Sequence, residues 1–525
     1  MSGQLATMVR VHLRTGWLAV VVWVVVVGGT MALTVSAIKG LYDSTEKIHS
    51  YAAAVHDDAL MMINGHIAGI DSLGGIIANE FGFLASFAIP FMAVSLIART
   101  TRKNEELGRL EAVLAGRISR ATPLLAAILV AVVAELLITA ALFASFAGVG
   151  VPGRDAALYS LSMGALGLAF IGVASIAAQL VAHTRGVYAI GLAGIIAAYA
   201  LRGIGDVRWS PLTWLSPLGW QEQTRAFGHQ RWWPLLIPLI VFALLAAAAL
   251  ALASRRDIGS ALLHAGSADP HASRFLRTPL GVALRCHRGS LLGWSTATVV
   301  VAGTFGSVAK PLVNAINGNP SLASAMGGGA GTTGLDSVLA MTALLLALLG
   351  AGYAVQAVGL LRAEESSGRL EARLSGDRSR WSWLSVQLAV VATGIVAVSV
   401  AGGAMFAASG SWSMGMNITQ QVVRAVIDFL PAVAFFGGLA LLVFTVVPRW
   451  GSVVWLVYAA GAAIAYLGDS LNLAGAVRDL SPFHLIGNPP VEAVDSGNVI
   501  LLTALTAACL VAGYASFRRR GIPQV

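Results

Sequence analysis

Residues 102–120 read RKNEELGRLEAVLAGRISR, and residues 362–380 read RAEESSGRLEARLSGDRSR. At an offset of 260 positions, the two segments share 11 identical residues in 19. Both segments are rich in charge, and each lies between long apolar runs. A polar segment that occurs twice in an otherwise apolar chain predicts two homologous halves, residues 1–260 and 261–525, each with one polar element exposed to water.

The composition predicts an integral membrane protein. Of the 525 residues, 57% are hydrophobic and only 11% are charged, whereas soluble proteins carry about 25% charged residues. The net charge of +9 does not indicate a nucleic-acid-binding protein, because the basic residues lie in short loops between apolar runs. The two cysteines predict no disulfide framework, and the ten histidines have no ligand spacing, so no metal site is expected.

Hydropathy predicts an all-α polytopic protein with twelve transmembrane helices in two pseudo-symmetric six-helix halves. A helix needs about 20 apolar residues to cross about 30 Å of hydrocarbon. The segments that meet this requirement are 16–38, 76–98, 121–147, 157–182, 187–203, 234–253, 291–310, 337–361, 382–408, 421–446, 450–468 and 498–517. The first apolar run is longer than the core of a signal peptide, so we interpret it as a retained helix.

The distribution of basic residues predicts the orientation. If the spans alternate from a cytoplasmic N-terminus, 24 of the 34 lysine and arginine residues fall on the cytoplasmic side. Both termini and both repeated segments are then cytoplasmic. Because six is an even number, the halves point the same way, as in parallel repeats related by an axis along the membrane normal.

The repeated segment has the features of a short amphipathic helix. Glu105 and Arg109, like Glu365 and Arg369, are spaced as favourable i,i+4 pairs, and leucines recur along one face. One interpretation is a helix that lies on anionic lipid, held by its arginines. Lipid binding explains the arginines but not the repeated glutamates and glycines, which favours docking of a soluble partner.

These residues resemble the coupling helix of ABC-2-type exporter permeases, and a second repeated motif extends the resemblance. Leu215-Ser216-Pro217 returns as Leu480-Ser481-Pro482, each before the last span of its half, where the family has the same motif. The layout of two permeases in one chain is similar to the actinobacterial exporters of polyketide antibiotics, the tetronasin-type group, with a type V exporter-like fold.

The resemblance implies a separate cytoplasmic ABC ATPase homodimer that binds ATP and Mg²⁺ beneath the permease. It also implies outer hairpins at about 204–233 and 469–497, carrying Ser216, Pro217, Ser481 and Pro482, and connecting helices at about 3–15 and 272–290. The residues expected to couple to the ATPase are Arg102, Glu105, Gly108, Arg109, Glu111, Leu114, Arg120, Arg362, Glu365, Gly368, Arg369, Glu371, Leu374 and Arg380.

No nucleotide site is expected in this chain. The motif G-x-x-x-x-G-K-[ST] does not occur, and the glycines at 329, 331 and 334 fall in a loop without a preceding strand. We therefore expect no cofactor bound by this chain, no catalytic residues, and a transport subunit rather than an enzyme.

Polar residues inside the predicted spans are candidates for a substrate pathway. Glu135 lies in the middle of the third span, where a charge is costly, so it is either a cation- or proton-linked site or a hydrogen-bonded structural carboxyl. Gln179, Gln356 and Gln387 are candidates to line a route, although buried polar residues also hold membrane helices together.

The predicted function is that of a multi-pass permease in the cell membrane that exports amphipathic small molecules such as drugs, antibiotics or lipids. Three alternatives remain open at this stage. They are a proton-driven secondary transporter with Glu135 as relay, a membrane-embedded transferase acting on lipid-linked substrates, and a sensor or immunity subunit that transports nothing.

Overall fold

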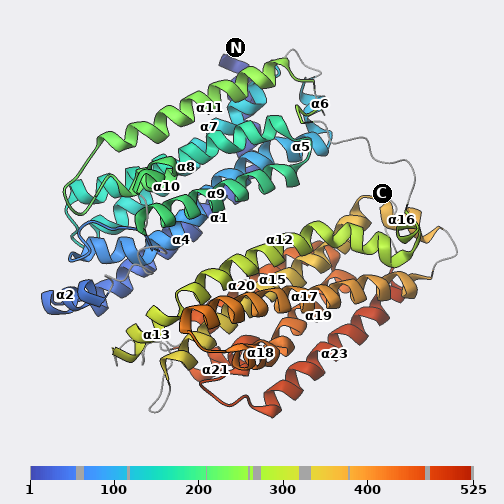
Figure 1. Ribbon diagram of the computed structural model, residues 1–525. Helices are drawn as coiled ribbons and strands as arrows, with labels where there is room; N and C mark the ends of the chain where they lie inside the picture. Colours follow the sequence, from blue (N-terminus) through green and yellow to red (C-terminus); the bar gives the residue numbers. More distant parts are fainter. Residues whose placement is uncertain are drawn as a thin grey trace. The chain divides into compact units, whose positions relative to one another are not determined.

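The computed structural model describes residues 2–54, 64–114, 119–207, 210–257, 260–263, 273–318, 333–375, 379–467 and 473–521. Every element of regular secondary structure in those ranges is a helix (Figure 1). The chain divides into two compact units, Met1–Ala268 and Asp269–Val525.

Ten helices in the described ranges are long and apolar enough to cross a membrane. They span Gly3–Leu41, Leu73–Glu106, Thr122–Ala147, Gly153–Leu180, Thr184–Asp206, Trp233–Arg255, Gly334–Ser366, Arg380–Met414, Thr419–Val446 and Ser496–Arg519. A helix satisfies its own backbone hydrogen bonds, which hydrocarbon cannot do. The chain is therefore a polytopic all-α membrane protein.

The other two predicted spans, 291–310 and 450–468, coincide with helices α12 (Pro279–Ser307) and α20 (Gly451–Leu467). Helix α12 carries Arg285 and Arg288 in its first half, and α20 has 17 residues. Neither is among the ten helices above.

Unit one contains the following elements: α1 (Ser2–Leu41), α2 (Thr45–Ala54), α4 (Leu73–Thr100), α5 (Arg102–Glu106), α6 (Arg109–Leu114), α7 (Thr122–Ala147), α8 (Gly153–Leu180), α9 (Thr184–Val207), η1 (Ser210–Leu215), α10 (Pro217–Glu222), η2 (Trp233–Leu235) and α11 (Leu236–Arg255). The connecting helix expected at 3–15 continues into the first span without a break, so α1 has 40 residues.

Unit two contains η3 (Phe275–Arg277), α12, α13 (Ala309–Gly318), α15 (Gly334–Ser366), α16 (Arg369–Leu374), α17 (Arg380–Met414), α18 (Thr419–Asp428), α19 (Leu430–Val446), η4 (Pro448–Trp450), α20, α21 (Gly475–Arg478), α22 (Pro482–Ile486) and α23 (Ser496–Arg519). Residue 272 of the second expected connecting helix (272–290) lies outside the described residues, and α12 starts at Pro279.

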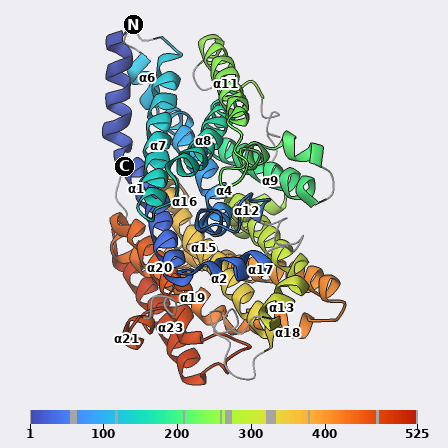
Figure 2. The same ribbon diagram turned by 90° about the vertical axis from the view of Figure 1, so that its left-hand side faces the viewer.

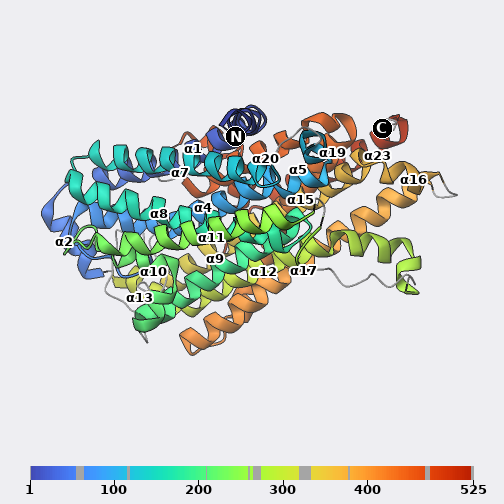
Figure 3. The same cartoon turned by 90° about the horizontal axis from the view of Figure 1, so that it is seen from above.

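Corresponding helices have the same neighbours within each unit. In unit one, α1 packs along α7 and contacts α4, while α8 packs against α4 and α11 (Figure 2). In unit two, α12 packs along α17 and contacts α15, while α19 packs against α15 and α23 (Figure 3). Each unit therefore buries its core by the same set of helix pairs.

Small residues let these helices approach closely. A Cβ atom at Gly164 of α8 would lie 2.3 Å from Thr139 Oγ1 of α7, and one at Gly394 of α17 would lie 1.8 Å from the Tyr353 hydroxyl of α15. Membrane helices have no hydrophobic driving force to associate within lipid, so such close packing supplies the attraction between them.

The repeated Leu-Ser-Pro motif starts a short helix in each unit. Ser216 caps α10 and Ser481 caps α22, and the proline that follows occupies the first turn, where its missing N–H costs nothing. Each serine is fully buried. The Ser216 hydroxyl also donates to the Ala198 carbonyl of α9 (2.6 Å), and the Ser481 hydroxyl donates to the Gly461 carbonyl of α20 (2.7 Å). The motif thus ties each hairpin to the preceding helix.

We expect Ser216→Ala and Ser481→Ala each to lower the free energy of unfolding by about 1–2 kcal/mol, because each removes a cap and a buried hydrogen bond. The melting temperature of the purified protein in detergent measures this. Ser254→Ala is the matched control, because the Ser254 hydroxyl is exposed and donates to a carbonyl of its own helix. Equal melting temperatures for all three variants would contradict the role given to the motif.

Candidate coupling site

A glycine divides the repeated segment in both units. Gly108 and Gly368 have φ of 68° and 71°, a left-handed conformation that favours glycine. Gly108 separates α5 from α6, and Gly368 separates the end of α15 from α16. The expectation of one continuous helix is therefore wrong at this point, and the chain turns where the sequence repeats its glycine.

Beyond the turn, each copy exposes an arginine and a glutamate. Arg109 and Glu111 of α6 are exposed to solvent, as are Arg369 and Glu371 of α16. Leu370 is fully buried and anchors α16 to its own unit. These four charged side chains lie beyond the turn, where a second protein can reach them.

The expected leucine stripe is interrupted, because the turn redirects the chain. Leu107 is exposed, Leu110 and Leu374 are half-buried, and the side chain of Leu114 lies outside the described part. Residues 115–118 and 376–378, which include the repeated Gly116 and Gly376, are also outside it.

Two residues before the turn, Arg102 and Glu105, point inward. Glu105 pairs with Arg102 through Oε2, and its Oε1 accepts from Arg256 Nη2 at 2.5 Å. The Glu105 side chain is only 6% exposed, and that of Arg102 only 1%. Arg102 also donates to the Ala178 carbonyl at 2.5 Å. The predicted Glu105–Arg109 pair is wrong, since Glu105 binds arginines on the other side.

Unit two repeats this arrangement. Glu365 is 3.3 Å from Arg362 Nη1 and pairs through Oε1 with Arg520, while its side chain is 2% exposed. Arg369, the predicted partner, is exposed on α16. Arg520 follows the last helix of unit two, just as Arg256 follows the last helix of unit one.

A further arginine completes each cluster. Arg120 Nη1 donates to the Arg256 carbonyl at 3.3 Å and to Asp257 at 2.8 Å, and Arg380 Nη1 donates to the Arg520 carbonyl at 2.8 Å. The first cluster (Arg102, Glu105, Arg120, Arg256) and the second (Arg362, Glu365, Arg380, Arg520) are called the clamps below.

The sequence analysis missed Arg256 and Arg520. Each ends the basic run that follows the last apolar segment of its half, and this shared position is the only signal in the sequence. Their glutamate partners lie about 150 residues away along the chain.

Around the clamps, the two units differ. In unit one, Glu106 accepts from the Thr184 N–H (3.0 Å) and hydroxyl (2.8 Å) at the start of α9. In unit two, the neighbouring carboxylate is the buried Glu364, which accepts from Arg373 Nη1 at 3.0 Å.

Gln387 lies in this second network. Its side chain donates to Glu364 at 3.5 Å and accepts from His287 Nε2 at 3.0 Å. Burial lowers the pKa of His287, so the imidazole favours its neutral form. The substitution of Glu106-Leu107 by Ser366-Ser367 thus accompanies a different polar network.

The remaining glutamine candidates belong to different units and have different surroundings. Gln179 is buried near the end of α8 beside the first clamp, and its amide donates to the Ser175 carbonyl at 3.3 Å. Gln356 is on an exposed face of α15 and accepts from Trp294 Nε1 at 2.7 Å. Their role in a pathway stays a prediction.

Glu135 is buried between α7 and α8 and is only 1% exposed. Neither carboxyl oxygen has a hydrogen-bond partner among the described residues. A Cβ atom at Gly167 of α8 would lie 2.1 Å from Glu135 Oε2, so the glycine makes room for the carboxyl group. Because a buried charge without a partner is costly, this environment favours the neutral acid.

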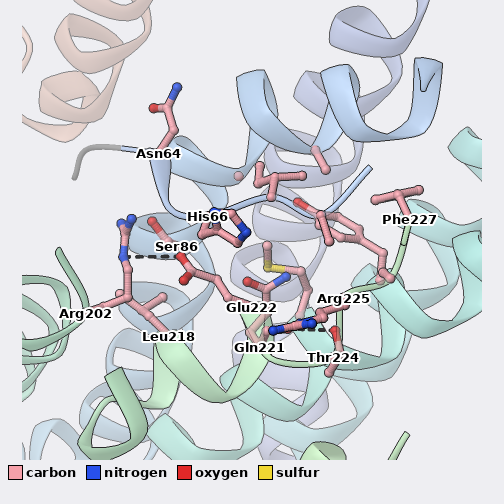
Figure 4. A pocket seen from close by; sticks show the side chains of 17 residues that line it. Asn64, His66, Ser86, Arg202, Leu218, Gln221, Glu222, Thr224, Arg225 and Phe227 are labelled. Carbon is pink, nitrogen blue, oxygen red and sulfur yellow. Dashed lines mark hydrogen bonds and ion pairs between the residues drawn. The ribbon is translucent and has the colours of Figure 1, made fainter. Parts of the chain in front are cut away.

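The hairpin of unit one holds a buried ionic cluster. Arg202 of α9 is 3.4 Å from Glu222 of α10 (Figure 4). Arg202 is also 3.8 Å from Asp206, and its guanidinium lies over the Tyr199 ring. The Asp206 carboxylate also accepts from Thr213 at 3.0 Å.

Gly65 packs directly against Glu222 and Arg202 of this cluster. A Cβ atom there would lie 1.8 Å from Glu222 Oε1, and its φ is +89°. His66, Gln221 and Arg225 line the small pocket next to it (Figure 4). Across the described ranges, histidine, cysteine and carboxylate side chains form no group of three that could hold a metal ion.

We expect the stability of unit one to depend on pH through Glu222. Burial raises the pKa of Glu222 well above its usual value of 4.5, with Asp206 adding to the rise and Arg202 opposing it. The folded hairpin therefore holds the proton more tightly than the unfolded chain. This stabilisation is complete below pH 4.5 and is lost as pH rises through the raised pKa of the folded protein.

The melting temperature of wild type should therefore fall more steeply with rising pH than that of Glu222→Gln, which cannot ionise. Asp71→Asn, at an exposed position, should keep the wild-type slope. The same slope for wild type and Glu222→Gln would show that Glu222 does not titrate in this way.

Two comparisons with known proteins agree with this architecture. Residues 276–518 match a family described as the C-terminal domain of the multidrug efflux system permease Rv1217c. The chain is also 29% identical over 524 residues to the multidrug efflux system permease protein Rv1217c of Mycobacterium tuberculosis (strain ATCC 25618 / H37Rv). That alignment covers 98% of this chain and 94% of the relative, so the similarity to an efflux permease extends through both units.

Proposed function

We propose that this chain is the transmembrane permease subunit of an ATP-driven ABC exporter in the cell membrane. Its cargo is an amphipathic small molecule such as a drug, an antibiotic (including polyketides of the tetronasin type) or a lipid. The observation that carries the proposal is the pair of exposed Arg-x-Glu motifs, Arg109–Glu111 and Arg369–Glu371. Each motif directly follows a glycine in the left-handed conformation. The named role of the relative in multidrug efflux supports it.

Energy comes from a separate ATPase. The sequence has no phosphate-binding loop, so ATP and Mg²⁺ bind to a partner chain. Two similar polar elements suit a homodimeric partner, with one ATPase subunit on α6 and the other on α16. The basic residues that flank these elements support a cytoplasmic position for them and for both termini.

The proposed mechanism is alternating access. ATP binding closes the ATPase dimer, and the closing subunits displace α6 and α16. Since helix bundles move as nearly rigid bodies, this displacement changes which side of the membrane can reach the cargo site. The permease contributes a different affinity for cargo in each of its two states.

Charge reversal tests the docking surface. We expect Glu111→Arg combined with Glu371→Arg to weaken ATPase binding by about 2 kcal/mol per site, roughly 30-fold in affinity, and to abolish permease-stimulated ATP hydrolysis. Copurification of the ATPase and its hydrolysis rate in vesicles measure this. The control reverses two exposed acids elsewhere, Glu46→Arg with Asp71→Arg. Normal stimulation in the first variant would rule out this surface.

A proton-driven secondary transporter is the second candidate, favoured by Glu135, whose carboxyl oxygens find no hydrogen-bond partner in the described part of the chain. The ABC proposal predicts efflux from vesicles that requires ATP and survives an uncoupler, and a Glu135→Gln variant that still hydrolyses ATP with altered cargo selectivity. The alternative predicts efflux that collapses with the uncoupler and is lost in Glu135→Gln. Efflux without any ATPase would decide for the alternative.

A further inference from the structure

We propose that Glu105 and Glu365 are positioning residues that fasten each coupling element to the end of the last helix of its own unit, so that ATPase movement reaches that helix directly. This inference rests on the proposed function. It assigns these two glutamates, and Arg256 and Arg520, to transmission within the permease rather than to contact with the ATPase.

Burial separates the two kinds of glutamate in the repeat. Glu105 and Glu365 are almost completely buried against arginines of their own unit, whereas Glu111 and Glu371 are exposed. A buried carboxylate that already pairs with two guanidinium groups has no free surface for a second protein. Removing one partner of such a pair leaves an uncompensated charge, which is strongly destabilising.

Each clamp joins four pieces of chain at one point. In unit one these are α5, the start of α7 through Arg120, the end of α8 through the Ala178 carbonyl, and the end of α11 through Arg256. The orphan carbonyl groups at helix ends supply the acceptors.

Unit two reaches the same four places with one exchange of donor. Arg380 at the start of α17 binds the Arg520 carbonyl, and Arg520 itself donates to the Phe444 carbonyl (3.0 Å) near the end of α19. In unit one, Arg102 makes the corresponding bond to Ala178. Different arginines thus bind the equivalent carbonyl groups in the two units. What both units have in common is that the clamp connects the same helices.

The last helix connects the clamp to the hairpin at its other end. Helix α11 follows η2 directly and contacts α10, and Asn498 of α23 donates to the Leu485 carbonyl of α22 at 3.0 Å. A shift of the clamped end is therefore passed along one rigid helix to the hairpin that Ser216 or Ser481 ties to the preceding helix.

The clamp itself is tested on the purified permease without any ATPase. A double-mutant cycle compares Glu105→Gln, Arg256→Gln and the double variant by melting temperature. We expect the melting temperature of the double variant to fall no further than that of the less stable single variant, because both single changes already break the Glu105–Arg256 contact. Glu111→Gln combined with Arg256→Gln is the control, and the falls in melting temperature caused by its two changes should add. Additive losses for Glu105 and Arg256 would overturn the clamp.

Transmission is tested with a reversible tether. In a background with Cys286→Ser and Cys509→Ala, Glu105→Cys and Arg256→Cys are joined by a short bifunctional methanethiosulfonate reagent and released by a reductant. With the ATPase present, we expect the untethered form to hydrolyse ATP with transport per ATP reduced about tenfold, and the tether to restore it.

If the tether restores transport per ATP, Glu105 acts as a positioning residue, since the tether replaces the connection to α11 but not the carboxylate. Failure of the tether to restore transport, or normal transport in the untethered form, would overturn transmission. If the parent without cysteines shows no ATP-driven transport at all, the proposed function fails and transmission with it. The double-mutant cycle would still report whether the clamp exists.

Discussion

Hydrocarbon offers no partner to a charge, and this constraint decides where the ionic groups of the chain lie. The carboxylates of the clamps lie where helices end, each between two arginines, and carbonyl groups near helix ends accept further guanidinium hydrogens. The ends of the third, fourth and sixth apolar segments of a unit therefore meet where its coupling element begins.

Both units keep the features that fix the backbone and vary the polar contacts around them. The glycine turn, the capping serine and the glutamate between two arginines occur in each unit. By contrast, Glu106 binds the start of α9 in unit one, whereas Glu364 binds Arg373 in unit two. Repetition thus identifies what the architecture needs, and divergence shows where the surroundings tolerate change.

The membrane class and the repeated polar element could be predicted from the sequence, because long apolar runs and an aligned repeat are local signals. The break at Gly108 could not be predicted from the sequence, since a single glycine is compatible with either a helix or a turn and contacts with neighbouring elements determine which one forms. The partners of Glu105 also escaped prediction. The i,i+4 rule selects Arg109, whereas the structure supplies Arg256 from the far end of the unit. Tertiary burial outweighs a local pair worth a few tenths of a kcal/mol.

The hairpins of the two units are unlike in one respect. Glu222 lies six residues after Ser216, and the position six residues after Ser481 is Gly487, which carries no charge. Unit one must therefore separate Arg202 from a buried acid before its hairpin can leave α9, and unit two has no such bond at that position. Opening of the hairpin of unit one therefore depends on pH through Glu222, whereas the corresponding glycine of unit two has no group that titrates.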